Sequence, residues 1–457
     1  MKILLTHGYF LHEDAKEKQI MKPYPPLGLL YISAWLEQHG FDNDVFDSTF
    51  SDFETLKKSL FESTPDVIGI YTNLMTKLNV LRIIQFIKTN RLRTKIVLGG
   101  PEVRNHKENF LKHGADVIVF GEGEETMLEL VKCFAQGKEI DAVNGIAYIK
   151  PTGEVIVNAE RELKKEIDLL ALPNRKKIDL NKYFTTWKNA HGQSVISMSS
   201  MRGCPYDCKW CSRAVYGQSY RRRSPAALVA EMKWLSEQYS FDMIWFVDDV
   251  FTINYPWLRE FVAELKKAGV KIPYEIITRA DRMNREIIEL LKESGCYRVW
   301  IGAESGSQKI IDAMSRRVKV EQVRDMINLA KQYGLQAGTF IMLGYPGETQ
   351  DDIAETLHHL KVSDPDHFTL TVAYPIKGTP LYTETEDRFI EQLPWETSTD
   401  RDIDFKRTYP RRFYQYAIRW VNNEVSLHKN IKSKRYTKVP WLKAKSVAAQ
   451  VGMMLTR

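Results

Sequence analysis

Cysteine is scarce in this chain, with five in 457 residues, and no long apolar run is present. An odd number of cysteines, three of them within eight positions, does not fit the disulfide framework of a secreted protein. No stretch approaches the roughly 20 apolar residues of a membrane span. The apolar run near the amino terminus is also too short for a signal peptide. We therefore expect a cytoplasmic protein that is neither exported nor transmembrane.

The composition is that of an ordinary globular protein, with 44% hydrophobic and 27% charged residues. The length suggests about three domains of roughly 150 residues each. The net charge of +7 is unevenly distributed: residues 401–457 hold 14 Lys and Arg against three acids, so the remainder is net negative. The basic character therefore belongs to the carboxy-terminal segment.

Residues 1 to about 140 alternate short runs rich in Val and Ile with segments of helical period. This alternation predicts βαβ crossovers and a doubly wound parallel sheet, closed by a hairpin around residues 151–154. We therefore predict an α/β, Rossmann-like domain over residues 1–160. Residues 161–193 carry mixed charge without a sustained apolar face, which predicts a linker. The predicted strands are residues 2–6, 44–47, 66–71, 95–99 and 116–120.

A second alternating series follows, with strand starts about every 25 to 50 residues, a spacing typical of a βα barrel. It contains six predicted strands and not eight, so we predict a partial (β/α)6 TIM-like barrel over residues 194–385. Chemistry in such folds lies at the carboxyl ends of the strands. Residues 386–457 would form a basic helical region. The strands predicted here are residues 194–199, 242–247, 274–278, 298–303, 337–343 and 367–374.

Three of the five cysteines, Cys204, Cys208 and Cys211, have the spacing CxxxCxxC directly after the first strand of this series. Three soft thiolates in one short loop can hold zinc or an iron–sulfur cluster. A structural zinc site closes with a fourth Cys or His, and the nearest histidines are the distant His191 and His358. The pattern therefore favours a cluster with one iron left open to a substrate.

With Trp210 as the aromatic residue before the last cysteine, this loop in a partial barrel resembles that of the radical S-adenosylmethionine (SAM) enzymes, over about residues 190–385. The resemblance implies that Cys204, Cys208 and Cys211 are catalytic and hold a [4Fe–4S] cluster. Its open iron would bind SAM, and an electron from a donor such as flavodoxin or ferredoxin would cleave the sulfonium bond.

The same resemblance implies SAM contacts at four successive strand ends. A carboxylate at Asp248 or Asp249 can accept from the methionine ammonium. The guanidinium of Arg279, after Thr278, can pair with the methionine carboxylate in a bidentate manner. A single acidic or basic side chain at a strand end is more often solvated or salt-bridged. We expect SAM contacts because suitable residues occur at four successive strand ends. The other implied contacts are Trp210, then Glu304 and Ser305 at the ribose, and Ile341 and Gly344 in a segment that resembles GxIxGxxE and lines the adenine.

An α/β domain ahead of such a barrel resembles the cobalamin-binding subfamily, which includes the anaerobic oxidative cyclase of bacteriochlorophyll synthesis and several radical methyltransferases. Glycines at strand-to-helix turns let the backbone approach a large ligand closely. The DxHxxG motif, which supplies an axial histidine, is absent, because His7 lacks the preceding Asp. The implied cobalamin contacts are Pro26, Leu27, Gly28, Thr72, Asn73, Leu74, Gly99, Gly100, Pro101, Glu102, Gly121, Glu122 and Gly123.

Two enzymatic outcomes stay open, because both use the same motifs: methylation of an unactivated carbon, or oxidative cyclisation and similar radical rearrangement. Methylthiolation is disfavoured, since those enzymes resemble this chain but carry three more cysteines in the amino-terminal domain, where only Cys133 occurs. A non-catalytic sensor that binds an iron–sulfur cluster and SAM is the third hypothesis.

The basic segment mixes Lys and Arg with Trp420, Tyr436 and Trp441. Such a mixture suits peripheral contact with an anionic membrane, and a solvated helical cap on the barrel is the alternative. Nucleic-acid binding is the least favoured of the three. We expect a small-molecule or lipid-like substrate, and a location in the cytoplasm or at the inner face of the membrane.

Overall fold

The computed structural model describes residues 1–457. The chain divides into two compact units. The first unit contains residues 1–205, 212–244 and 393–401, and the second contains residues 206–211, 245–392 and 402–457. The loop that carries the three cysteines is thereby divided, with Cys204 in the first unit and Cys208 and Cys211 in the second.

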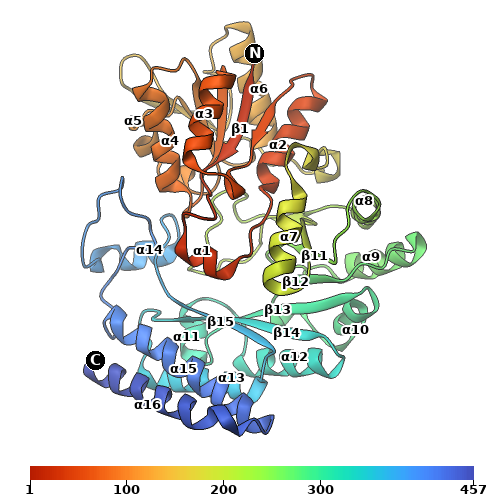
Figure 1. Cartoon of the computed structure of the whole chain (residues 1–457), viewed down its shortest axis with the longest axis vertical. Coiled ribbons are helices and arrows are strands. Elements are labelled where there is room, and N and C mark those ends of the chain that lie inside the picture. The colour runs from red at the N-terminus through yellow and green to blue at the C-terminus, as the bar shows by residue number, and fades with distance from the viewer. The chain divides into compact units, whose positions relative to one another are not determined.

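The first unit is built on a seven-stranded sheet of order β2-β1-β3-β4-β5-β6-β7 (Figure 1). The first five strands pair in parallel and the last two add an antiparallel hairpin, so the predicted doubly wound sheet is confirmed. The order β2-β1-β3-β4-β5 reverses direction between β1 and β3, where sheets of this kind bind ligands. The strands are β1 (Ile3–His7), β2 (Asp44–Phe46), β3 (Val67–Tyr71), β4 (Lys95–Gly99), β5 (Val117–Val119), β6 (Ile146–Ile149) and β7 (Val155–Val157).

Two apolar cores lie on opposite faces of this sheet, because side chains alternate along each strand. Leu4 of β1 joins one core, and its neighbours Ile3 and Leu5 join the other. The first core is covered by α3 (Phe53–Ser63), α4 (Lys77–Thr89) and α5 (Lys107–Lys112). The second is covered by α2 (Leu27–Gln38) and α6 (Gly123–Gln136). The short α1 (Ala15–Ile20) buries none of its residues.

The predicted linker contains a helix that the sequence analysis did not anticipate, α7 (Leu180–His191). Its residues Leu180, Tyr183, Phe184 and Trp187 are buried, a spacing that makes one apolar face. The Tyr183 hydroxyl donates to Asp47 Oδ2 at 2.8 Å, so the helix is fastened to the first sheet. The first unit also contains α8 (Pro225–Gln238) and the two-residue strands β9 (Met201–Arg202) and β10 (Arg221–Arg222).

The second sheet has six strands in the order β15-β14-β13-β12-β11-β8, as predicted for a partial barrel. The pairs from β12 to β15 are parallel. The strands are β8 (Val195–Met198), β11 (Met243–Phe246), β12 (Tyr274–Thr278), β13 (Cys296–Glu304), β14 (Gln336–Leu343) and β15 (His367–Val372). The helices that follow or separate them in the second unit are α9 (Tyr255–Ala268), α10 (Arg285–Glu293), α11 (Gln308–Ala313), α12 (Val320–Gln332), α13 (Gln350–Ser363) and α14 (Pro380–Thr385).

The basic carboxy-terminal region forms two helices, α15 (Arg411–Lys432) and α16 (Val439–Leu455), which pack side by side (Figure 1). Helix α15 also packs on α13 and β15 and buries Phe413, Tyr414 and Trp420. These helices are therefore integrated into the second unit. No helix of the structure combines the length and the apolar composition needed to cross a membrane.

Candidate functional site

The cysteine loop of the second unit, residues 206–211, is fixed by backbone and side-chain contacts. The Lys209 N–H donates to the Met314 carbonyl at 3.2 Å, and the Leu381 N–H donates to the Lys209 carbonyl at 2.9 Å. Trp210 packs on a buried cluster that includes Met314 and Tyr345. The backbone on either side of Cys208 therefore has a defined position before any ligand binds.

Two arginines approach the buried sulfur of Cys208. Arg279 follows β12, as the sequence predicts, and Arg316 follows α11; each places a guanidinium nitrogen 3.7 Å from Cys208 Sγ. Arg279 is itself held by Asp281 at 2.8 Å and covers the ring of Tyr206 at 3.8 Å. Positive donors around a sulfur stabilise negative charge on it, whether it is a thiolate or part of a cluster.

Arg316 is the main residue that the sequence analysis missed. Its Nη2 donates to the Gly302 carbonyl at 3.1 Å and lies 3.8 Å from Glu304 Oε1. Burial by itself lowers the pKa of Arg316, but Glu304 and Cys208 raise it above its ordinary value. The flanking residues Ser315 and Arg317 have φ angles of +54° and +55°. No spacing in the sequence signals this arrangement, because it depends on an irregular turn after α11.

Glu304, predicted at the ribose, is buried at the end of β13 with a φ of +66°. The register of β13 on β14 shifts between Gly302 and Glu304, an irregularity that redirects a side chain. Burial raises the pKa of Glu304, and the charges of Arg316 and Arg279 only partly oppose this effect. In the structure Glu304 is thus a neighbour of Arg316. Its predicted contact with SAM stays a prediction.

Four of the remaining predicted SAM contacts lie at or just after the end of a strand, and Ile341 lies within β14. Asp248 is buried and Asp249 is exposed after β11. The Thr278 hydroxyl hydrogen-bonds that of Thr252. Ser305 Oγ lies 3.2 Å from Thr356 Oγ1, and Ile341 is buried in β14.

Gly344 begins a turn after β14 that is built around a buried carboxylate. It has a φ of +79°, and its N–H donates to Glu348 Oε2 at 2.5 Å. The other oxygen, Oε1, is buried without a hydrogen-bond partner. Burial therefore raises the pKa of Glu348 to about 8, although the Gly344 N–H opposes the change. Glu348 holds the turn that contains Gly344.

The three cysteines fit a cluster by their chemistry. Soft thiolates suit iron and sulfide, and the two guanidiniums at Cys208 suit the negative charge of a ligated cluster. In the structure no three His, Cys, Asp or Glu side chains are arranged as metal ligands. Cys208 is buried, Cys204 is half-buried and Cys211 is exposed. Ligation by all three together stays a prediction.

In the first unit, two of the predicted cobalamin segments are joined by their backbones. The Thr72 N–H donates to the Gly99 carbonyl at 2.7 Å, and the Glu102 N–H donates to the Thr72 carbonyl at 3.3 Å. Gly100 has a φ of +107°, and a Cβ there would lie 3.1 Å from the Thr72 nitrogen. The turns after β3 and β4 therefore form one surface, where only glycine fits at position 100.

The other two predicted cobalamin segments begin α2 and follow β5. Gly28, next to Pro26 and Leu27, is exposed with open space at its Cβ position. Glu122, between Gly121 and Gly123, pairs with Arg202 and Arg221, each at 2.7 Å. Burial raises the pKa of Glu122, but these two arginines outweigh it, so the pKa is lowered. The Glu122 carboxylate is therefore committed to anchoring strands β9 and β10.

His7, at the end of β1, uses both ring nitrogens within the protein. Nε2 lies 3.1 Å from Asp47 Oδ1, and the Tyr9 N–H donates to Nδ1 at 3.2 Å. Burial raises the pKa of Asp47, but the hydrogen bond and charge of His7 lower it overall. Both nitrogens of the His7 ring are therefore occupied by partners within the first unit.

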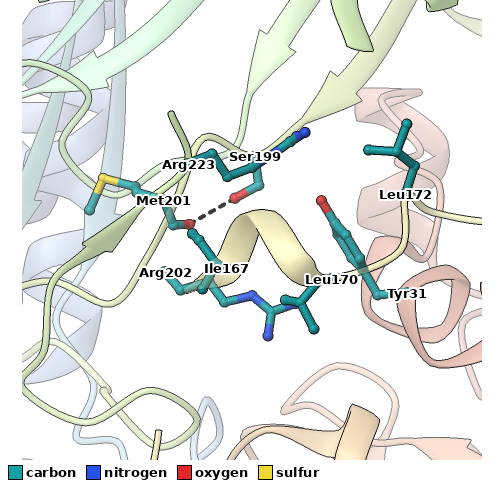
Figure 2. Close-up of a pocket in the computed structure, with 8 residues that line it drawn as sticks. All are labelled: Tyr31, Ile167, Leu170, Leu172, Ser199, Met201, Arg202 and Arg223. Atoms are coloured by element: carbon teal, nitrogen blue, oxygen red, sulfur yellow. Dashed lines mark hydrogen bonds between the residues drawn. The ribbon is translucent and has the colours of Figure 1, made fainter. Parts of the chain in front are cut away.

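A small cavity in the first unit lies next to these ion pairs (Figure 2). It is about the size of one water molecule. Arg202 and Arg223 border it beside Tyr31, and the Ser199 hydroxyl donates to the Met201 carbonyl at 2.8 Å on its wall. A space of this size does not hold a substrate.

Comparison with known proteins identifies two families in the chain. The model of the radical SAM superfamily matches residues 198–360, and that of the B12 binding domain matches residues 19–131. These matches confirm the expected cofactors: a [4Fe–4S] cluster, SAM and cobalamin. Members of the superfamily act on small molecules and need a reductant.

Similarities over most of the chain agree with these two family matches. The chain is 30% identical over 390 residues to an uncharacterized methyltransferase of Pyrococcus horikoshii, which covers 84% of this chain and 82% of that protein. It is 26% identical to the anaerobic magnesium-protoporphyrin IX monomethyl ester cyclase of Rubrivivax gelatinosus, covering 85% and 70%. The fold matches the methyltransferase TsrM from Kitasatospora setae, solved with cobalamin and a [4Fe–4S] cluster, with a TM-score of 0.71, 20% identity, and coverage of 84% and 78%. The chain is therefore an enzyme of the radical SAM superfamily, in the group that carries a B12 binding domain.

Proposed function

We propose that this enzyme methylates an unactivated carbon of a small, lipophilic molecule. The observation that carries the proposal is the buried Cys208, held between Arg279 and Arg316 in a loop with the spacing CxxxCxxC. The names of two similar proteins support the reaction class: the methyltransferase of Pyrococcus horikoshii and the hopanoid C-3 methylase of Methylococcus capsulatus, which is 26% identical over 372 residues.

The residues proposed to bind the cluster and SAM lie mostly in the second unit, and those proposed to bind cobalamin lie in the first. When bound, the cluster would supply an electron for cleavage of SAM, and cobalamin would carry a methyl group. Cys204, Cys208 and Cys211 would ligate the cluster, while Arg279 and Arg316 stabilise the negative charge on the Cys208 sulfur. Asp248 offers acceptors for the methionine ammonium. The turns after β3 and β4 would hold the cobalamin.

The test is anaerobic purification with cluster reconstitution, followed by iron and cobalt analysis and a dithionite-driven assay of SAM cleavage. We expect about four iron atoms and one cobalt atom per chain. Methylation produces S-adenosylhomocysteine together with 5′-deoxyadenosine. A fully ligated zinc ion in place of iron would contradict the proposal.

Oxidative cyclisation is the second candidate, supported by the similarity to the Rubrivivax cyclase. It predicts 5′-deoxyadenosine without S-adenosylhomocysteine. A non-catalytic sensor predicts neither product. The same product analysis therefore separates all three functions.

Two further parts of the proposal concern partners and location. A flavodoxin or ferredoxin would supply the electron, so either one should replace dithionite in the cleavage assay. We also propose that the enzyme works in the cytoplasm at the inner face of the membrane, where a lipophilic substrate is available, and that its basic carboxy-terminal region makes the contact.

A further inference from the structure

Helix α16 is apolar on two opposite faces, and only one of them is covered. Leu442, Ala449 and Met453 are buried on the side that faces α15. On the same side Ser446 Oγ donates to Glu424 Oε1 at 2.6 Å, and a Cβ on Gly452 would collide with the Tyr416 ring. This side is closely packed, so the orientation of α16 about its own axis is fixed.

The opposite side of α16 is exposed and contains no charged residue. Trp441 is 58% exposed and Met454 is 75% exposed. At 100° per residue, the exposed apolar side chains fall within an arc of roughly 140°, centred opposite the buried side. Lys443 and Lys445 lie at its two borders. The members of this exposed face are Trp441, Ala444, Val447, Ala448, Val451, Met454 and Leu455.

All charged residues near the exposed face in the sequence are basic. No Asp or Glu follows Glu424, whereas eight Lys and Arg do. Lys432 pairs with Asp364 at 2.6 Å, and Lys443 lies 3.8 Å from Glu424. A basic cluster just before α16 and at its start, Lys434, Arg435 and Lys438, has no acidic partner in ion-pair range.

We propose that α16 is an in-plane membrane-binding helix, which places its exposed face in the interface of an anionic bilayer. Lysines at the borders of an apolar face can reach the lipid headgroups, and Trp and Tyr favour that depth. Each Lys or Arg near an anionic surface adds attraction. The 17 residues of α16 and the two lysines within it exclude a spanning position.

A second copy of the chain fits this face less well. Two-fold pairing through the exposed faces would bring lysines of the two copies together along both borders of the contact, where like charges repel. An anionic bilayer can bury the apolar face and attract the bordering lysines at the same time. The inference rests on the membrane contact of the proposed function and deepens it, because it names the helix and the face that bind the bilayer.

The test is sedimentation of the full-length, reconstituted enzyme with vesicles of phosphatidylcholine containing 30% phosphatidylglycerol, and with phosphatidylcholine alone, both at 0.1 M salt. We expect binding to the anionic vesicles and at least tenfold weaker binding to the neutral ones. Exchange of three charges, Lys434→Gln, Arg435→Gln and Lys438→Gln, should weaken anionic binding about a hundredfold. The matched control exchanges three exposed lysines of the first unit, Lys18→Gln, Lys58→Gln and Lys138→Gln, and should change little.

A second variant tests the apolar face without changing charge. Val447→Ser with Val451→Ser should weaken vesicle binding at least tenfold, because two apolar side chains are no longer available for burial in the bilayer interface. Val362, exposed on α13 of the same unit, gives the control Val362→Ser. Unchanged circular dichroism and thermal unfolding should show that all variants fold.

Three results would overturn the inference. They are no binding to anionic vesicles, equal binding of the Val447→Ser, Val451→Ser variant, or a dimer that this variant dissociates while vesicles remain unbound. Vesicle binding is measured without SAM or reductant, and SAM cleavage is measured without vesicles. Failure of the membrane contact and failure of the proposed reaction are therefore seen separately.

Discussion

The sulfur of Cys208, which lies between two guanidiniums, shows how much can be predicted from sequence for single residues. Cys208 and Arg279 were predicted, because one belongs to a cysteine spacing and the other follows a strand. Arg316 was not, because the turn that directs it toward Cys208 has left-handed residues on both sides and no periodic signal. The pairing of Glu122 with Arg202 was also not predicted, because it joins residues 80 positions apart.

Replacement of Arg316 should change the reduction potential of the cluster. The guanidinium donates toward the Cys208 sulfur at 3.7 Å and so favours the more negative, reduced state. In Arg316→Gln we expect a potential lower by roughly 60 mV, equivalent to about 1.4 kcal/mol for one electron. A redox titration followed by electron paramagnetic resonance measures it. Arg317→Gln is the control, since Arg317 pairs with Asp207 in the same region. An equal potential in both variants would contradict this role.

The buried carboxyl of Glu348 should make stability depend on pH. Its pKa is about 8 in the folded protein, whereas the ordinary value of 4.5 applies in the unfolded chain. Folding therefore favours the protonated form. Its stabilising contribution is full below pH 4.5 and is lost as the pH rises to 8, at about 1.4 kcal/mol per unit. Glu348→Gln keeps an acceptor for the Gly344 N–H and should unfold at a higher temperature than wild type at pH 8.

The measurement is thermal unfolding between pH 5 and 8. The advantage of Glu348→Gln over wild type should grow across this range. Glu355 lies exposed on α13, the helix that follows Glu348, and Glu355→Gln should follow the wild-type curve. Parallel curves for all three proteins would mean that Glu348 titrates normally.

At the scale of elements, the sequence predicts what is periodic and misses what is short or locally irregular. All eleven predicted strands are present, because most of them are continuous apolar runs. The two-residue strands β9 and β10 are too short to have a period. Helix α7 was missed because it was grouped with the charged stretch before it, although its four buried side chains have helical spacing. The second apolar face of α16 was not recognised as such, since it lies opposite another apolar face.

The turn that leads from β9 to the cysteine loop should require glycine at position 203. Gly203 has a φ of +84°, and a Cβ there would lie 2.6 Å from the Ser219 carbonyl oxygen. We expect Gly203→Ala to lower stability by about 1 to 3 kcal/mol and to reduce the iron bound after reconstitution. Calorimetry and iron analysis measure the two effects.

Gly217 provides the matched control for this substitution. It also has a positive φ, of +62°, but nothing lies within 4 Å of its Cβ position. Gly217→Ala should therefore show only the smaller backbone cost and keep its iron. Equal losses in the two variants would assign the whole effect to the backbone angle and none to the contact with Ser219.

At the scale of the whole molecule, the segments predicted to bind cobalamin and the cluster cysteines lie largely in different units. The turns after β3 and β4 belong to the first unit, and Cys208 and Cys211 belong to the second. This division could be foreseen in outline from the two alternating series. The return of residues 393–401 to the first unit could not be foreseen. There Trp395 packs on Phe110 at 4.8 Å and lies under the Lys77 ammonium at 4.3 Å, contacts that join residues far apart in the sequence.

Because the sites are divided in this way, each cofactor should be lost without the other. Cys208→Ala should abolish SAM cleavage and lower iron content while still binding aquacobalamin, whereas Cys133→Ala, in α6, should keep both activities. Gly100→Val should do the reverse, since its side chain would collide with Thr72 and displace the turns after β3 and β4. Iron analysis and cobalamin absorbance measured on the same samples give both occupancies. Loss of both cofactors in either variant would mean that one site is needed to build the other.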